Sequence, residues 1–235
     1  MTGPLLRFSA VVKDYQGLRP LRIAGLEVAS RDQLAIVGLD RSAAEVFISL
    51  ATGATLPDRG NIQLFGRPTG AIRDSSDWLA TLDRFGIVSE RAVLLDALSV
   101  IQNLAVPFSL EIEPPPPDVR ARARALAREV GLDESAWDRP VADLDGTGRL
   151  RVRLARALAL DPSVLVLEHP TAVLPPGDTA SAARHIRAVS ERRGLAAVTL
   201  TADQEFASAI AARVFILDPA TGRLSPRRRG WFRRP

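Results

Sequence analysis

The chain of 235 residues carries 31 Lys and Arg against 27 Asp and Glu, a formal net charge of +4, and 46% of its residues are hydrophobic, enough for one substantial core. It has no cysteine, which excludes a disulfide framework and a thiolate metal site, and its two histidines are too few for a histidine-based metal site. No apolar run approaches the roughly 20 residues of a membrane span, and the N-terminus lacks a secretory pattern, so we expect a cytoplasmic protein.

The first part of the chain is rich in strand patterns. Apolar and polar residues alternate from Leu6 to Lys13, the period of a strand with one buried face, and this strand ends near Tyr15. A second strand is predicted over residues 21–28 and a third over residues 33–37. The third strand leads directly into the segment that begins at Gly38.

That segment reads GLDRSAAEVF and joins the third strand to a predicted helix that ends at Gly53. A phosphate-binding loop reads GxxxxGK[ST], because its glycines let backbone N–H groups surround the phosphates, its lysine neutralises their charge and its hydroxyl binds magnesium. Aligned on Gly38, the segment has Ala43 at the second glycine, Ala44 at the lysine and Glu45 at the hydroxyl. This loop is therefore predicted to bind a triphosphate poorly.

The middle of the chain changes from strands to helices. Residues 62–65 and 85–88 read as short strands. The four prolines 114–117 predict a stiff spacer that no helix crosses. Asp118 is then predicted to cap a helix that ends at Gly131 and carries a stripe of arginines opposite its apolar face.

The stretch from Leu144 to Pro176 has the clearest pattern. A turn around Gly146 and Gly148 opens an arginine-rich helix, Asp161 and Pro162 break it, and the apolar residues 164–167 predict a buried strand that ends in Glu168, His169, Pro170 and Thr171. A helix capped by Asp178, a strand over residues 195–200, a helix over 204–212 and a strand over 213–217 complete the alternation.

The order and spacing of these segments resemble the ATP-binding subunits of ABC transporters, in which LSGGQ opens a helix and a strand ends in DEPT. The resemblance covers nearly the whole chain. It implies an α/β, P-loop NTPase-like ABC ATPase fold, with a mixed core sheet whose antiparallel edge includes the N-terminal hairpin. The single domain would consist of a core over about residues 1–89 and 161–226, a helical subdomain over about 90–160 and a basic tail over 227–235.

The resemblance also implies site positions. Tyr15 lies at the position of an aromatic residue that stacks on adenine, and Glu90 at a glutamine that contacts magnesium. Glu168 and His169 stand at the aspartate and glutamate of the strand tip, and Ala202 replaces a histidine that senses the γ-phosphate. The other positions of the family's ATP site are Gly38, Arg41, Ser42, Ala43, Ala44, Glu45 and Val46, and those of its signature turn are Asp145, Gly146, Thr147 and Gly148.

This sequence departs from the family's residues in every nucleotide-binding motif, while the apolar pattern of its strands and helices is intact. Together these features predict a degenerate ABC subunit. Such a pseudo-ATPase would have a structural or regulatory role in a membrane transport complex, with weak or absent binding of ATP and magnesium and no catalytic or metal-ligating residue. A divergent active ATPase stays open, in which Arg41 replaces the lysine and Glu168 with His169 supplies the metal site and the base. A third hypothesis is a module outside transport that binds another protein or a nucleic acid.

The expected partners follow from the resemblance and from the tail. Residues 90–108 keep the family's loop length and its apolar pattern around Asn103, which predicts docking of a membrane permease through Arg91, Leu94 and Leu95 at the inner face of the cytoplasmic membrane. An intact ABC ATPase or a second copy could complete a dimer. The basic, aromatic tail 227–235 either is solvated or lies on anionic lipid, and no nucleic acid is expected because no base-reading motif is present.

Overall fold

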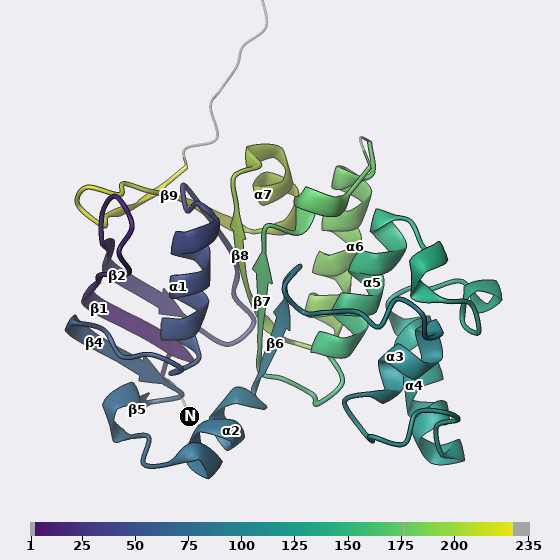
Figure 1. Cartoon of the computed structure of the whole chain (residues 1–235). Coiled ribbons are helices and arrows are strands. Elements are labelled where there is room, and N and C mark those ends of the chain that lie inside the picture. The colour runs from purple at the N-terminus through teal and green to yellow at the C-terminus, as the bar shows by residue number, and fades with distance from the viewer. Residues whose placement is uncertain (1–2, 176, 228–235) are drawn as a thin grey trace, which may run out of the picture.

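The computed structural model describes residues 3–175 and 177–227, which form two β-sheets with helices around them (Figure 1). The larger sheet has the strand order β10, β9, β3, β8, β7, β6. Its parallel strands are β3 (Gln33–Val37), β6 (Phe85–Val88), β7 (Val164–Glu168), β8 (Ala196–Thr201) and β9 (Arg213–Leu217), and β10 (Leu224–Pro226) pairs antiparallel to β9. Every residue of β3, β7 and β8 is buried, as expected for parallel strands covered on both faces. The predicted α/β fold is thereby confirmed.

The smaller sheet is antiparallel and contains the N-terminal hairpin. Its strands are β1 (Leu6–Lys13), β2 (Leu21–Val28), β4 (Arg59–Leu64) and β5 (Arg67–Pro68), in the order β2, β1, β4, β5. The hairpin thus forms a sheet of its own and does not extend the core sheet, at whose edge the sequence placed it. The reason is packing: the apolar face of β1 lies against a helix, and the rings of Phe8 and Phe47 stack with their centroids 5.2 Å apart.

That helix, α1 (Arg41–Ala51), joins the two sheets into one core. Its buried residues belong to an apolar cluster that also contains Ile62 from the antiparallel sheet and Ile36 and Val166 from the parallel sheet. Figure 1 shows α1 between β1 on one side and β7 and β8 on the other. Helix α1 is therefore packed between strands of both sheets.

The helices that follow β6 lie on the opposite side of the parallel sheet. These are α3 (Val100–Ala105), α4 (Pro117–Glu129), α5 (Gly146–Ala157), α6 (Thr179–Arg192) and α7 (Gln204–Ile210), and their apolar residues share one cluster with the sheet. In Figure 1, α3 and α4 lie farthest from the antiparallel sheet. Among the described helices, none is long and apolar enough to cross a membrane. The division into a core and a helical subdomain stays a prediction.

Two details of the predicted helices are wrong. The N-cap of α4 is Pro116 and its first residue is Pro117, so Asp118 lies inside the first turn and does not cap the helix. The last two of the four prolines therefore belong to the helix start and not to a spacer, because a proline suits the first helical position, where its missing N–H would have no partner. The last helix, α7, ends at Ile210, before the predicted Ala212.

The C-terminal segment is described only as far as Arg227. The Arg227 guanidinium donates to the carbonyl oxygen of Gln204 at 2.9 Å and to the hydroxyl of Ser208 at 2.6 Å. The rest of the predicted basic tail, residues 228–235, lies outside the described residues.

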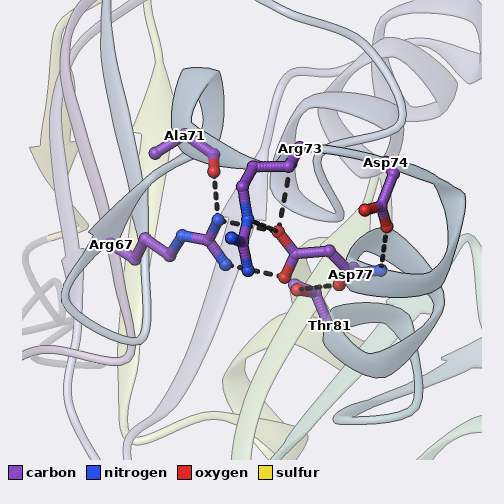
Figure 2. Close-up of polar contacts among 6 residues, drawn as sticks. All are labelled: Arg67, Ala71, Arg73, Asp74, Asp77 and Thr81. Carbon is purple, nitrogen blue, oxygen red and sulfur yellow. Dashed lines mark hydrogen bonds and ion pairs between the residues drawn. The ribbon is translucent and has the colours of Figure 1, made fainter.

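Helix α2 (Ser75–Leu82) is held mainly by polar contacts, since each of its residues is at least partly exposed. Figure 2 shows the Arg67 guanidinium donating to both carboxylate oxygens of Asp77, each at 2.7 Å, and to the carbonyl oxygen of Ala71. The backbone N–H of Arg73 donates to the same carboxylate at 3.0 Å, and Asp74 caps the helix. The hydrogen bonds from Arg67 and then from Arg73 lower the pKa of Asp77 to about 2.

Candidate functional site

Gly38 and Asp40 shape the loop between β3 and α1. Gly38 has a φ of 107°, and a Cβ atom added there would lie 3.0 Å from the carbonyl oxygen of Leu217. Asp40 is the N-cap of α1, and its carboxylate accepts the backbone N–H of Ala43 at 2.7 Å. Ala44, at the position of the family's lysine, is fully buried in the core. The start of α1 is therefore capped by a carboxylate of the chain itself.

A surface cavity of about 810 Å³ opens beside this loop. Asp40 lines it together with most of the positions that the resemblance assigned to the ATP site: Tyr15, Gly38, Ser42, Ala43, Glu45 and Val46. Burial raises the pKa of Tyr15 above its usual value, and the nearby charge of Asp40 raises it further. The structure thus places the aromatic residue and the loop around one hollow, with two carboxylates on its wall.

A second, smaller cavity of about 170 Å³ brings together the first turns of α1, the residues that follow β6 and the end of β7. It is lined by the predicted site residues Arg41, Ser42, Glu45, Glu90, Glu168 and His169, and also by Ser89 and Arg91. Arg41 pairs with Glu90 at 3.3 Å. Charged side chains of the chain therefore pair with one another here.

Arg91 is the centre of this second cavity. Its Nη1 lies 2.5 Å from Oε1 of Glu45, and its Nη2 lies 2.9 Å from Oε2 of Glu168. The same Glu168 oxygen also accepts Arg91 Nε at 3.2 Å and the Ser89 hydroxyl at 2.5 Å. Glu168, whose side chain is only 9% exposed, is thus paired with a cation and bound by a hydroxyl.

His169 follows Glu168 in a left-handed conformation, with φ 42° and ψ 50°. Its backbone N–H donates to the carbonyl oxygen of Leu200 at 2.8 Å, which fixes the tip of β7 against β8. Its Nε2 atom is buried and has no hydrogen-bond partner within the described residues. Ala202, after β8, is exposed, and its methyl side chain can neither donate nor accept a hydrogen bond.

The predicted signature turn lies at the start of α5, and its four residues line neither of the two cavities described above. Asp145 is the N-cap of α5 and accepts the backbone N–H of Gly148 at 2.7 Å. Gly146 is required by packing, because an added Cβ atom would lie 1.7 Å from the carbonyl oxygen of Val173. The Thr147 hydroxyl donates to Asp178 at 2.6 Å, so the Asp178 carboxylate serves that contact and does not cap α6.

The predicted permease-docking residues do not form one surface. Leu94 is 6% exposed and belongs to the core, so its prediction as a docking contact is wrong. The Arg91 guanidinium forms ion pairs with Glu45 and Glu168. Leu95 is 39% exposed and the neighbouring Val93 is 73% exposed. The accessible apolar side chains of this segment are thus Val93 and Leu95.

Asp40 and Ser89 were not predicted as site residues, and Arg91 was predicted as a docking residue and not as part of this site. Asp40 carried a usable signal, since aspartate directly before a helix is a preferred N-cap. Ser89 and Arg91 carried none, because their roles depend on Glu168, which lies 79 and 77 residues away along the chain.

Comparisons with known proteins agree with this fold. The family model described as ABC transporter matches residues 24–172. The methionine import ATP-binding protein MetN of Brucella abortus (strain 2308) is 29% identical over 217 residues, which cover 92% of this chain and 58% of that protein. The lipoprotein-releasing system ATP-binding protein LolD of Alcanivorax borkumensis is 29% identical over 209 residues, covering 87% of this chain and 91% of that protein. The chain thus spans a little over half the length of its methionine-import relative.

Solved structures show the same architecture. The structure of cbiO1 from Clostridium perfringens, part of the ABC transporter complex cbiONQ, gives a TM-score of 0.79 at 22% identity and covers 95% of this chain and 87% of that one. A dimeric bacterial ABC transporter cassette gives a TM-score of 0.75 at 20% identity, covering 94% of this chain and 98% of that one. At these identities the likeness shows the fold alone.

Proposed function

The chain belongs to the ABC transporter family, whose model matches residues 24–172, and from this premise we propose that it is a pseudo-ATPase subunit of a membrane transport complex. Its role is structural or regulatory, with little or no ATP hydrolysis. The two relatives described above are named for methionine import and for lipoprotein release. The proposal therefore concerns a transport complex and names no cargo.

The observation that carries the proposal is the Asp40 carboxylate on the start of α1. A phosphate-binding loop keeps its first helical N–H groups and the positive end of the helix dipole free for the phosphates. Here the N–H of Ala43 is bonded to Asp40 at 2.7 Å. Glu45 also lines the cavity, but its carboxylate is paired with Arg91, so the uncompensated negative charge at this place is that of Asp40. A carboxylate and a phosphate oxygen about 4 Å apart, at an effective dielectric constant of about 20, would repel each other by about 4 kcal/mol. The residues present do not fit a triphosphate.

The remaining catalytic positions support the same proposal. Glu168 is paired with Arg91, and His169 has no phosphate-binding lysine near it, since the loop 38–46 contains none. The resemblance implies that the signature turn of one subunit closes over the triphosphate of another. Asp145 would present a carboxylate there, and in a dimer with an intact ABC ATPase both composite sites would be weakened. The assembly would then hydrolyse ATP slowly.

The proposed partner is a membrane permease, with the chain peripheral on the inner face of the cytoplasmic membrane. Val93 and Leu95, the exposed apolar residues of the segment after β6, are the proposed contacts. This replaces the sequence-based set, whose Leu94 is buried. An intact ABC ATPase or a second copy of the chain is the proposed dimer partner, and the tail 227–235 is proposed to add contact with anionic lipid.

Reversal of the loop tests the proposal. Five substitutions restore the phosphate-binding pattern and remove the charge at Asp40: Asp40→Asn, Arg41→Gly, Ala43→Gly, Ala44→Lys and Glu45→Thr. The unmodified protein should show no magnesium-dependent ATPase above background, and the reversed variant should gain ATP binding in a calorimetric titration. The matched control carries Asp40→Asn alone and should gain much less, since it still lacks the lysine.

Two results would contradict the proposal in different ways. Hydrolysis by the unmodified protein that is lost in His169→Ala would favour the divergent ATPase, with Arg41, Glu168 and His169 as its working residues. Purification from its native source with a soluble partner and with no permease would favour a module outside transport.

A further inference from the structure

Arg91 lies between two carboxylates that the fold brings together from distant elements. Glu45 comes from α1 and Glu168 from the end of β7, and Arg91 contacts them at 2.5 Å and 2.9 Å. By resemblance, Glu45 stands at the magnesium-binding hydroxyl and Glu168 at the magnesium-orienting aspartate. The two positions that would hold a divalent cation in this family are thus joined by a guanidinium.

We propose that Arg91 is a built-in cation that takes the place of a divalent metal ion between Glu45 and Glu168, and that it fixes the segment 89–96 without nucleotide or metal. The inference rests on the proposed function, because it explains how a subunit that binds no Mg²⁺ keeps this region ordered. It concerns the residues of the chain itself, and it assigns Arg91 a positioning role.

The fit of a metal ion to this place is poor. Mg²⁺ requires near-octahedral oxygen ligands at about 2.0–2.1 Å, whereas Glu168 Oε2 already accepts the Ser89 hydroxyl and two nitrogens of Arg91. A metal ion would have to displace that guanidinium. Within residues 3–175 and 177–227, no group of three or more His, Asp or Glu side chains is placed to hold a metal ion.

The charge balance explains why Arg91 is needed. The side chain of Glu168 is 9% exposed, and a buried carboxylate requires a positive partner and hydrogen-bond donors. Arg91 supplies the charge, and Ser89 supplies a donor from the same short segment. Because Arg91 also reaches Glu45, one guanidinium ties the end of β7 to α1 and to the residues after β6.

The rest of the segment is held by further hydrogen bonds. Arg156 of α5 donates to the carbonyl oxygen of Val93 at 2.6 Å. The Asn103 side chain of α3 accepts the N–H of Leu95 at 2.8 Å and donates to its carbonyl oxygen at 3.0 Å. With Arg91 at one end and Asn103 at the other, the exposed side chains of Val93 and Leu95 are presented in a fixed position.

The test compares Mn²⁺ binding, measured by electron paramagnetic resonance, and the Mg²⁺ dependence of Tm in wild type and Arg91→Gln. Wild type should bind no Mn²⁺ at this place and should have a Tm independent of Mg²⁺. Arg91→Gln should lower Tm by about 5 °C, should bind about one Mn²⁺, and should regain at least half of the lost Tm in millimolar Mg²⁺. Adding Glu168→Gln should abolish both metal effects.

Two matched variants make the comparison specific. Arg91→Lys keeps the charge and should bind no Mn²⁺. Arg41→Gln removes an arginine from the same cavity that pairs with Glu90 and not with Glu168, and it should match wild type in Mn²⁺ binding. Amide hydrogen exchange over residues 91–96 should be at least about tenfold faster in Arg91→Gln and unchanged in Arg41→Gln.

Stoichiometric Mn²⁺ binding by wild type that Glu168→Gln removes would overturn the inference. So would an Arg91→Gln variant that binds no Mn²⁺ or keeps the wild-type exchange rates. These outcomes differ from failure of the proposed function, which would appear as magnesium-dependent ATP hydrolysis by wild type or as micromolar binding of ATP in the presence of Mg²⁺.

Discussion

The cap at Asp40 gives the sharpest quantitative prediction. Asp40→Ala removes the acceptor of the Ala43 N–H, now 2.7 Å from the carboxylate, while leaving the buried face of α1 untouched. Loss of an N-cap of this kind costs about 1–2 kcal/mol. In a protein of this size each kcal/mol corresponds to about 2–4 °C. The Tm of Asp40→Ala should therefore fall by about 2–8 °C in a calorimetric scan.

The control is Asp40→Asn, which keeps a side-chain oxygen for the same hydrogen bond and loses only the charge at the helix N-terminus. That charge contributes about 0.3–1 kcal/mol, and its contribution falls as salt is added. Asp40→Asn should thus lie between wild type and Asp40→Ala at low salt and approach wild type at high salt. If Asp40→Ala were as stable as wild type to within about 0.3 kcal/mol, the carboxylate would not be capping α1, and the reasoning about the phosphate site would fail.

Three other predictions test the fold around the site. Gly146→Ala should be strongly destabilised or fail to fold, because its Cβ would lie 1.7 Å from the carbonyl oxygen of Val173; a soluble variant with wild-type Tm would contradict this. Leu94→Ala should lose about 2–5 kcal/mol of unfolding free energy because Leu94 is 6% exposed. Val93→Asp, at a side chain 73% exposed, should change the unfolding free energy by less than about 0.5 kcal/mol but should reduce co-purification with the proposed permease partner. If Val93→Asp is as unstable as Leu94→Ala, or retains the permease fully, the proposed docking surface is wrong. The pKa of Asp77 is lowered from its usual 3.8 to about 2, so the ionised carboxylate stabilises the fold above about pH 4. This contribution is lost as the pH falls toward 2, and the unfolding free energy of Asp77→Asn should therefore vary less with pH between about 4 and 2. A curve of stability against pH that runs parallel to that of wild type would refute the assignment.

Much of the fold could be predicted because its strands have a strong local pattern. The apolar run Val164 to Leu167 matches β7 apart from its last residue, and Gln33 to Val37 matches β3. The place of the N-terminal hairpin could not be predicted in the same way. It depends on the contact between Phe8 and Phe47, which are far apart along the chain, and alternation alone does not say which neighbour a strand will have.

The candidate site shows a similar division. The family resemblance placed Tyr15 at one cavity, Glu90 and Glu168 at the next, and Glu45 at both. Spacing could not show that Arg91 would reach two carboxylates from separate elements, since that depends on side-chain geometry across the sheet. The sequence therefore indicated which groups are missing from a nucleotide site, and the structure adds which groups of the chain lie in their place.

The affinity of the unmodified protein for ATP tests the central claim most directly. Isothermal titration with ATP and Mg²⁺, with an intact ABC ATPase as the positive control, should give no saturable binding by wild type up to millimolar ATP. This corresponds to a binding free energy weaker than about −4 kcal/mol. A dissociation constant near one micromolar, about −8 kcal/mol, would contradict the account of this chain as a pseudo-ATPase.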